Sequence, residues 1–447
     1  MRVDPWLVRA ASIAPRRSAI ETPSGSWSYA ELLTVARSGA GWLAARGAAP
    51  GARVGIALPA GLAFAQALHA CLLLGAIAVP VDLRLAAQER AAVTEGCALV
   101  VEEPLWEGPS TPAAELVPGH ELQAPAVLIH TSGTTAAPRP VLLTHGNLLW
   151  SALGSAVALG LDPQERWLCS LPLTHVGGLS ILVRSAIYAT TAIVHERFDT
   201  DAALHALRGE GVTLVSVVAT TLARLLDAGL ERPPALRCAL AGGGPVPASL
   251  LARAAAAGVA VSQTYGLSES GSQATTVPVA ALSGGDTGGQ DHGAGPPLFC
   301  TRVRIAGDGE ILLAGPTIAP GAPSPDGWLH TGDLGRLDES GALHVSGRLA
   351  DTIISGGENV APAEVEAVLE GYPGVLEAAV VGRPDPDWGE AVTALVVARE
   401  GISIDERELR AFCAASLAPF KLPRRVVVVA GPLPRTRSGK LLRRELI

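Results

Sequence analysis

The chain has 447 residues, of which 48% are hydrophobic and 17% are charged, and its formal net charge is −8. This length predicts two or three domains, and an acidic chain without clustered lysines and arginines argues against nucleic-acid binding. The N-terminus has no apolar leader, and the long apolar run at 63–81 is interrupted by Gln66, His69 and Gly75. We therefore expect neither a signal peptide nor membrane insertion.

The first 330 residues alternate short apolar runs with helical stretches. Strands are expected at 54–58, 78–82, 190–194, 212–217 and 239–241, and helices at 62–75 and near 200–210. This alternation predicts parallel β-sheets covered by helices, with ligands bound at the carboxyl ends of the strands. The stretch 281–297, rich in Gly, Ser and Asp, is expected to be a flexible loop.

The sequence changes character after residue 330. A β-hairpin is expected at 335–347, around an Asp-Glu-Ser-Gly turn. The next hundred residues predict two strands and two helices, at 376–382, 391–398, 362–370 and 404–417. We therefore expect a small α+β domain whose boundary lies near 347–351.

Cysteine and lysine usage both carry information. The six cysteines have no metal-binding spacing, which predicts reduced thiols, no zinc site and a cytoplasmic protein. Lys421 and Lys440 are the two lysines among 34 basic residues. A lysine kept in such a background suggests a role that arginine cannot fill, namely a compact point charge on a flexible stem. Lys440 is the candidate, and Lys421 is expected to be an ordinary surface residue.

A loop rich in hydroxyl groups follows the apolar run at 126–129. Its candidate phosphate-binding residues are Thr131, Ser132, Gly133, Thr134, Thr135 and Arg139. Backbone N–H and hydroxyl groups at the end of a buried strand can converge on phosphate oxygens, and Arg139 adds a positive charge. A plain Ser/Thr/Gly turn between a strand and a helix is the competing explanation.

Further candidates lie downstream. Tyr265 could stack on a base, Gly266 allows close approach, and Glu269 could hold Mg²⁺ through oxygen. Asp333 could bind a ribose diol, although a turn aspartate is the simpler interpretation. The set is completed by the basic loop that carries Lys440, by two glycine turns, and by three polar residues. The turns are Gly242, Gly243, Gly244 and Gly356, Gly357, and the polar residues are Ser268, Arg348 and Glu358.

In this order and spacing, the motifs resemble the adenylate-forming superfamily of acyl- and aryl-CoA synthetases, carrier-protein adenylation domains and luciferases. The resemblance runs from about residue 5 to the end. It implies an α/β fold: a large domain, 1–347, with parallel sheets and a small distorted barrel, and a small mobile α+β domain, 348–447. The expected hinge is Ala350.

The resemblance also implies roles. ATP would bind through Thr131, Ser132, Gly133, Thr134, Thr135, Arg139, Gly242, Gly243, Gly244, Tyr265, Gly266, Ser268, Asp333 and Arg348. Glu269 would hold Mg²⁺, and Lys440 would bridge the acyl carboxylate and the α-phosphate. Coenzyme A would meet Gly356, Gly357 and Glu358. The phosphate loop departs from the usual pattern, because Ala136, Ala137, Arg139 and Pro140 replace its glycines and lysine, so a weaker phosphate grip is expected.

A narrower resemblance concerns the acid substrate. The stretches 171–185 and 351–364 are similar to o-succinylbenzoate–CoA ligases of menaquinone biosynthesis. That similarity implies an acyl pocket at His175, Gly178, Ser180, Arg184 and Thr220, with His175 also gating it. A packed core histidine is the alternative for His175, and Gly178 is expected to leave room for a ring.

Three interpretations stay open. The chain could instead be another aryl- or acyl-CoA ligase, or an enzyme that loads a carrier protein. It could also be a nucleotide-binding regulator with impaired catalysis, given the altered phosphate loop. The expected partners are a small carboxylic acid, ATP and coenzyme A, with a homodimer possible.

Overall fold

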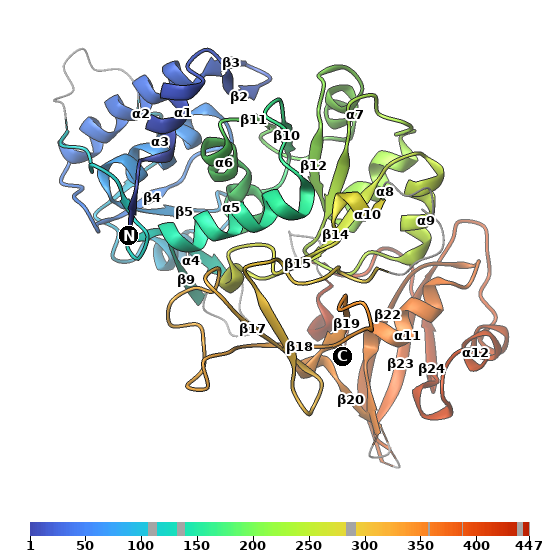
Figure 1. The fold of residues 1–447 in the computed structure, drawn as a ribbon. Coiled ribbons are helices and arrows are strands. Elements are labelled where there is room, and N and C mark those ends of the chain that lie inside the picture. The colour runs from blue at the N-terminus through green and yellow to red at the C-terminus, as the bar shows by residue number, and fades with distance from the viewer. Residues whose placement is uncertain are drawn as a thin grey trace.

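The computed structural model describes residues 1–105, 114–131, 139–282, 292–355, 358–386, 388–435 and 441–446 (Figure 1). All six cysteines lie in these ranges and are free thiols, as predicted. In the same ranges no helix is long and apolar enough to cross a membrane.

Two sheets with mainly parallel strands form the first part of the chain. The five-stranded sheet has the order β6 (Leu99–Val101), β4 (Arg53–Ile56), β5 (Ile77–Pro80), β8 (Pro125–Thr131), β9 (Arg139–Thr144). The eight-stranded sheet has the order β15 (Thr275–Thr276), β14 (Val261–Tyr265), β13 (Cys238–Ala241), β12 (Leu214–Val217), β10 (Arg166–Cys169), β11 (Thr191–Val194), β2 (Ser18–Thr22), β3 (Gly25–Ser28). Only the edge strands β9, β15 and β3 run antiparallel to their neighbours in these sheets.

Helices cover both faces of both sheets. One buried core lies between the sheets and includes side chains of α1 (Trp6–Ile13), α2 (Tyr29–Ala44), α3 (Leu62–Leu74), α5 (His145–Leu159) and α6 (Val176–Tyr188). Outside this core, α4 (Ala87–Thr94) packs on the five-stranded sheet, and the eight-stranded sheet is covered by α7 (Thr200–Gly209), α8 (Ala219–Asp227) and α9 (Ala248–Ala256). In β10, Trp167 and Cys169 face the central core and Leu168 faces the outer one, as the two-residue period of a strand requires.

An antiparallel sheet follows, with the order β16 (Arg302–Ile305), β17 (Glu310–Ala314), β18 (Leu329–Leu337), β19 (Leu343–Arg348). It stands where the resemblance implied a small barrel, and in the described residues it is an open four-stranded sheet. The expected hairpin is confirmed as β18 and β19, whose turn is held by hydrogen bonds from Ser340 and Ala342 to the Asp338 carboxylate.

The last part of the chain has its own sheet and core, drawn in orange to red in Figure 1. Its elements are β20 (Ile353–Ser355), β21 (Glu358–Val360), α11 (Pro362–Glu370), β22 (Val375–Asp385), β23 (Gly389–Ala398), α12 (Glu406–Ala414) and β24 (Arg425–Val428). The helix α12 starts two residues later than expected, because the Asp405 carboxylate caps it by accepting hydrogen bonds from the N–H groups of Arg407 and Glu408.

Short elements complete the fold. The pair β1 (Arg2–Val3) and β7 (His120–Glu121) is antiparallel. The helix α10 (Val279–Leu282) occupies the start of the expected 281–297 loop, and residues 283–291 lie outside the described ranges. Otherwise the strands and helices predicted from alternation are confirmed to within a few residues at their ends.

Candidate functional site

Asp333 is the centre of a buried polar cluster. The hydroxyl of Tyr265, at the end of β14, donates to its Oδ2 at 2.8 Å, and Nε of Arg348, at the end of β19, forms an ion pair with its Oδ1 at 2.8 Å. Asp333 is only 5% exposed, and burial together with its charge raises the pKa of Tyr265, which keeps that hydroxyl a donor. The structure thus brings together three residues singled out from the sequence, and each carboxylate oxygen has a partner.

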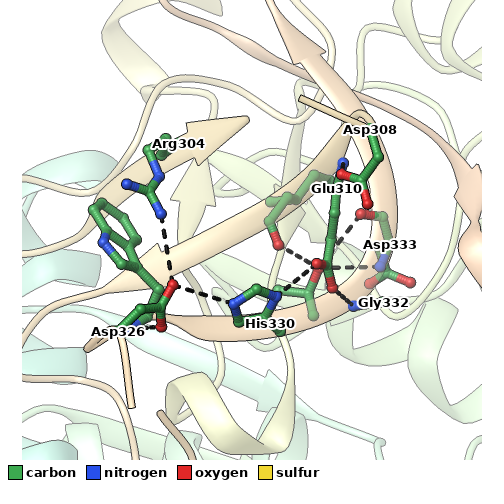
Figure 2. A network of polar contacts seen from close by, with 10 residues as sticks. Arg304, Asp308, Glu310, Asp326, His330, Gly332 and Asp333 are labelled. Atoms are coloured by element: carbon green, nitrogen blue, oxygen red, sulfur yellow. Dashed lines mark hydrogen bonds and ion pairs between the residues drawn. The ribbon is translucent and has the colours of Figure 1, made fainter. Parts of the chain in front are cut away.

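The turn before Asp333 is held by β17 (Figure 2). Oε1 of Glu310 accepts the Gly332 N–H at 2.8 Å, while Oε2 faces His330 Nδ1 at 2.7 Å. Gly332 has a φ of 69°, which favours glycine because a side chain there would be strained. Sequence reasoning missed Glu310, and its signal was a carboxylate at the start of a strand that is otherwise wholly apolar and buried.

The glycines near Tyr265 serve the packing of the chain itself. A Cβ on Gly266 would lie 1.6 Å from the Ser272 carbonyl oxygen, and one on Gly242 would lie 2.8 Å from Thr264 Cγ2. The space of the missing Gly266 Cβ is therefore taken by the chain itself, and the expectation that this glycine leaves space for a ligand is wrong. In the turn that begins at Gly242, Gly243 has a φ of 80°, and a Cβ on Gly244 would meet no atom within 4 Å.

Glu269 lies in the short helix η1 (Ser268–Ser270), one residue after Ser268. Its backbone carbonyl accepts the Ala319 N–H, while its carboxylate pairs with no other described residue. A hard oxygen ligand without a competing partner fits Mg²⁺, which commonly binds one or two protein carboxylates together with phosphate oxygens. The described residues contain no group of three or more metal-ligating side chains.

The phosphate loop is described only at its ends. Thr131 closes β8 and donates through Oγ1 to the carbonyl of Arg139, which opens β9 and is exposed. Glu358 begins β21 and is exposed as well. Several expected site residues lie outside the described ranges: Ser132, Gly133, Thr134, Thr135, Gly356, Gly357 and Lys440.

The expected acyl residues lie on or beside α6. His175 is the residue before this helix, and Gly178, Ser180 and Arg184 are on it, whereas Thr220 lies on α8. A Cβ on Gly178 would meet the Pro172 carbonyl at 2.5 Å, so this glycine accommodates its own turn rather than leaving room for a ring. The Ser180 hydroxyl is also used internally and donates to the Gly177 carbonyl.

His175 faces a carboxylate at the end of β5. Burial raises the pKa of Asp82, but the hydrogen bonds from Arg84, with a smaller effect of the charge on His175, outweigh this and leave it below its usual value. The histidine is half-buried rather than enclosed, so the alternative of a packed core histidine does not describe it.

Arg184 is the most unusual member of this set. Its side chain is buried, Nη2 donates to Ser151 Oγ at 3.0 Å, and Nε has no partner. Ser151 in turn donates to the carbonyl of Gly271, the residue after η1. Burial lowers the pKa of Arg184, and within the described part of the chain it makes no ion pair with a carboxylate. Ser151 was missed because nothing in its sequence context points to this contact.

The chain belongs to the family of AMP-binding enzymes. The model of that family matches residues 7–321, and the model of the AMP-binding enzyme C-terminal domain matches residues 364–440. Since these models cover most of the chain, they confirm the resemblance inferred from its motifs.

More specific relatives align along the whole chain. It is 37% identical over 479 residues to the 2-succinylbenzoate–CoA ligase of Bacillus subtilis (strain 168), covering 99% of this chain and 97% of the relative. The fold matches o-succinylbenzoate CoA synthetase from Bacillus subtilis in complex with ATP and magnesium ion, with a TM-score of 0.90, 36% identity and 100% coverage of both chains. The complex of that synthetase with the acyl-adenylate intermediate OSB-AMP also gives a TM-score of 0.90, at 36% identity, covering 100% of this chain and 98% of the other.

Arg184→Met is expected to raise the free energy of unfolding of the ligand-free protein by about 1 kcal/mol. The change replaces a buried charge that lacks a carboxylate partner with an apolar side chain of similar length. Chemical denaturation measures the effect.

Arg237→Met is the matched control. Arg237 pairs with Glu165 at 2.5 Å, and the Glu165 side chain is 2% exposed. Its loss leaves a buried carboxylate without its cation and is expected to lower stability by about 3 kcal/mol. Equal destabilisation by both variants would contradict the assignment of Arg184 as an uncompensated charge.

Proposed function

We propose that this protein is an AMP-forming acid–thiol ligase that joins o-succinylbenzoate to coenzyme A in two steps, as required in menaquinone biosynthesis. The observation that carries the proposal is the Tyr265–Asp333–Arg348 cluster, in a chain similar over its whole length to 2-succinylbenzoate–CoA ligase. We also propose that it works in the cytoplasm, where its six free cysteines stay reduced.

In the first step, a carboxylate oxygen of the acid attacks the α-phosphorus of ATP. A new O–P bond forms, the bond from the α-phosphorus to the bridging oxygen breaks, and pyrophosphate leaves with that electron pair. Such transfer depends on positioning and charge stabilisation more than on covalent work by the protein. Thr131, Arg139 and the loop between them would hold the phosphates, and Lys440 would hold the carboxylate and α-phosphate oxygens together.

Asp333 is suited to hold the ribose. The hydrogen bond from Tyr265 and the ion pair with Arg348 fix the carboxylate in orientation, while each oxygen retains acceptor capacity for a ribose hydroxyl. Tyr265 and the turn Gly242, Gly243, Gly244 would border the adenine. Glu269, with its carboxylate unpaired among the described residues, would hold Mg²⁺, which neutralises phosphate charge when bound.

The acid has two carboxylates, and only one is activated. The other needs a positive charge, and Arg184 has a guanidinium whose Nε lacks a partner. This buried cation is linked through Ser151 to Gly271, beside the helix that carries Glu269. We assign Arg184 to the second carboxylate, with His175, Gly178, Ser180 and Thr220 along the same acyl pocket.

In the second step, the thiol sulfur of coenzyme A attacks the acyl carbon and AMP leaves. We propose that residues 348–447 rotate against residues 1–347 about Ala350, withdrawing Lys440 and bringing Gly356, Gly357 and Glu358 to the pantetheine. Hinge rotation of one domain against another is a common conformational change in enzymes.

Incubation with o-succinylbenzoate, ATP, Mg²⁺ and coenzyme A is expected to yield the thioester, AMP and pyrophosphate in equal amounts. Chromatography of all three products measures this. Turnover only with benzoates or fatty acids would replace the substrate assignment with that of a general ligase. Nucleotide binding without pyrophosphate release from any acid would favour the regulator interpretation.

Lys440→Ala is expected to lower acyl-adenylate formation by about a thousandfold, because a charge aimed at the transferring group is lost. Thioester formation from supplied acyl-adenylate should stay within about threefold of the wild-type rate.

Lys421→Ala is the matched control. Its ammonium group pairs with the Glu364 carboxylate, so both half-reactions should remain at wild-type rates. Normal adenylation by Lys440→Ala would overturn the role given to Lys440.

The expected homodimer remains a prediction, and light scattering of the purified protein tests it.

A further inference from the structure

His330 lies between two carboxylates at the start of β18 (Figure 2). Its Nδ1 is 2.7 Å from Glu310 Oε2, and its Nε2 is 3.3 Å from Asp326 Oδ2. A neutral imidazole carries a single N–H and cannot donate to both partners. The geometry therefore belongs to the imidazolium, and the two carboxylates, Glu310 first, hold the pKa of His330 above its usual value.

Other charges of both signs lie around this histidine. Asp308 accepts the backbone N–H of Glu310, and Asp333 follows three residues after His330. Two arginines lie in the same region: Arg304 of β16 is 3.7 Å from Asp326 Oδ2, and Arg348 pairs with Asp333. The Glu310 side chain is 10% exposed and that of His330 is 42% exposed, so the histidine can exchange its proton with solvent while its main partner stays buried.

Glu310 connects this histidine to the nucleotide residues. One of its oxygens binds His330, and the other accepts the N–H of Gly332, the residue directly before Asp333. Thr331 ties the same turn to β17 by donating to the Ile311 carbonyl, and its hydroxyl accepts the Asp333 N–H. Whatever moves the Glu310 carboxylate therefore acts on the backbone that presents Asp333.

We propose that His330 is a positioning residue for ATP. The imidazolium of His330 holds the Glu310 carboxylate in place, and with it the turn that carries Asp333. It also offsets the negative charge of Glu310 beside the nucleotide. This inference rests on the proposed function, in which Asp333 holds the ribose. When His330 loses its proton, the contact with Asp326 is lost, the charge of Glu310 is no longer balanced, and ATP binding weakens. The KM for ATP should then rise as pH increases through the pKa of His330.

Two substitutions change the charge of the His330–Glu310 pair while largely keeping the size and shape of its side chains. In Glu310→Gln, the amide oxygen can still accept the Gly332 N–H, and the amide nitrogen can donate to a neutral His330. The net charge then equals that of the protonated wild-type pair, so the KM for ATP should stay low at all pH values. In His330→Gln, Glu310 keeps its charge without a cation, so the KM should be high at all pH values.

The test is the KM for ATP with saturating Mg²⁺ and o-succinylbenzoate, from about pH 6.5 to about pH 9.5. The matched control is His344→Gln, because His344 also pairs with a carboxylate, Asp338, in the same sheet but at the β18–β19 turn. The profile of His344→Gln should follow that of the wild type. Dividing the wild-type KM by that of His330→Gln at each pH removes the ionisation of ATP and of other site groups. We expect a rise of about three- to tenfold in the wild type, the size of the net contribution of one hydrogen bond, with kcat changed less than about twofold.

If the KM for ATP of the wild type changed with pH in parallel with that of either His330→Gln or Glu310→Gln, the inference would be overturned. An NMR titration in which the His330 ring protons show no lower pKa in Glu310→Gln would also overturn it. That titration needs no turnover, so it separates this inference from the proposed function, which fails instead if the wild type shows no turnover at any pH.

Discussion

The carboxylate of Asp333 joins parts of the chain that the fold would otherwise leave independent. Tyr265 reaches it from the last long strand of the eight-stranded sheet, and Arg348 reaches it from the end of the antiparallel sheet. A buried carboxylate is costly unless charged and polar donors satisfy it, so each of the three residues constrains the other two. The position where the parallel sheet meets the antiparallel one is thereby fixed at the point where the nucleotide is proposed to bind.

Much of this arrangement could be predicted from the sequence, for physical reasons. Apolar runs of strand length separated by helices identify parallel sheets, and such sheets collect ligands at the carboxyl ends of their strands. Tyr265, at the end of β14, follows that rule. Arg348 opposes Asp333 in the β18–β19 ladder just beyond the ends of the hairpin predicted at 335–347, across a register shift at Leu334 and Gly335 that the sequence does not predict.

What could not be predicted depends on side chains from distant elements. Glu310 supports the Asp333 turn, and Ser151 links Arg184 to Gly271, yet neither has a local motif. The reasons for Gly178 and Gly266 were also misjudged, because composition shows that a glycine is present and not which atoms occupy the space of its missing Cβ. Those atoms are carbonyl oxygens of Pro172 and Ser272.

Arg184 and His330 both carry a positive charge near the proposed ligand site, but their surroundings differ. Arg184 is buried with no carboxylate partner in the described residues, and in the proposed function its charge serves the second carboxylate of the acid at some cost in stability. His330 is half-exposed between two carboxylates, so its charge supports the protein's own turn and depends on pH. The first arrangement suits recognition of an acid, and the second suits positioning of a nucleotide-binding residue.

If the Asp333 carboxylate binds the ribose of ATP, as proposed, its removal should weaken ATP binding and leave binding of the acid unchanged. Exchange of labelled pyrophosphate into ATP, driven by o-succinylbenzoate, measures the first half-reaction alone in the wild type and in Asp333→Asn. We predict a KM for ATP about 10- to 100-fold higher in the variant, the size of lost hydrogen bonds to a charged group, with the KM for o-succinylbenzoate changed less than about twofold. A folded variant with an unchanged KM for ATP would contradict it.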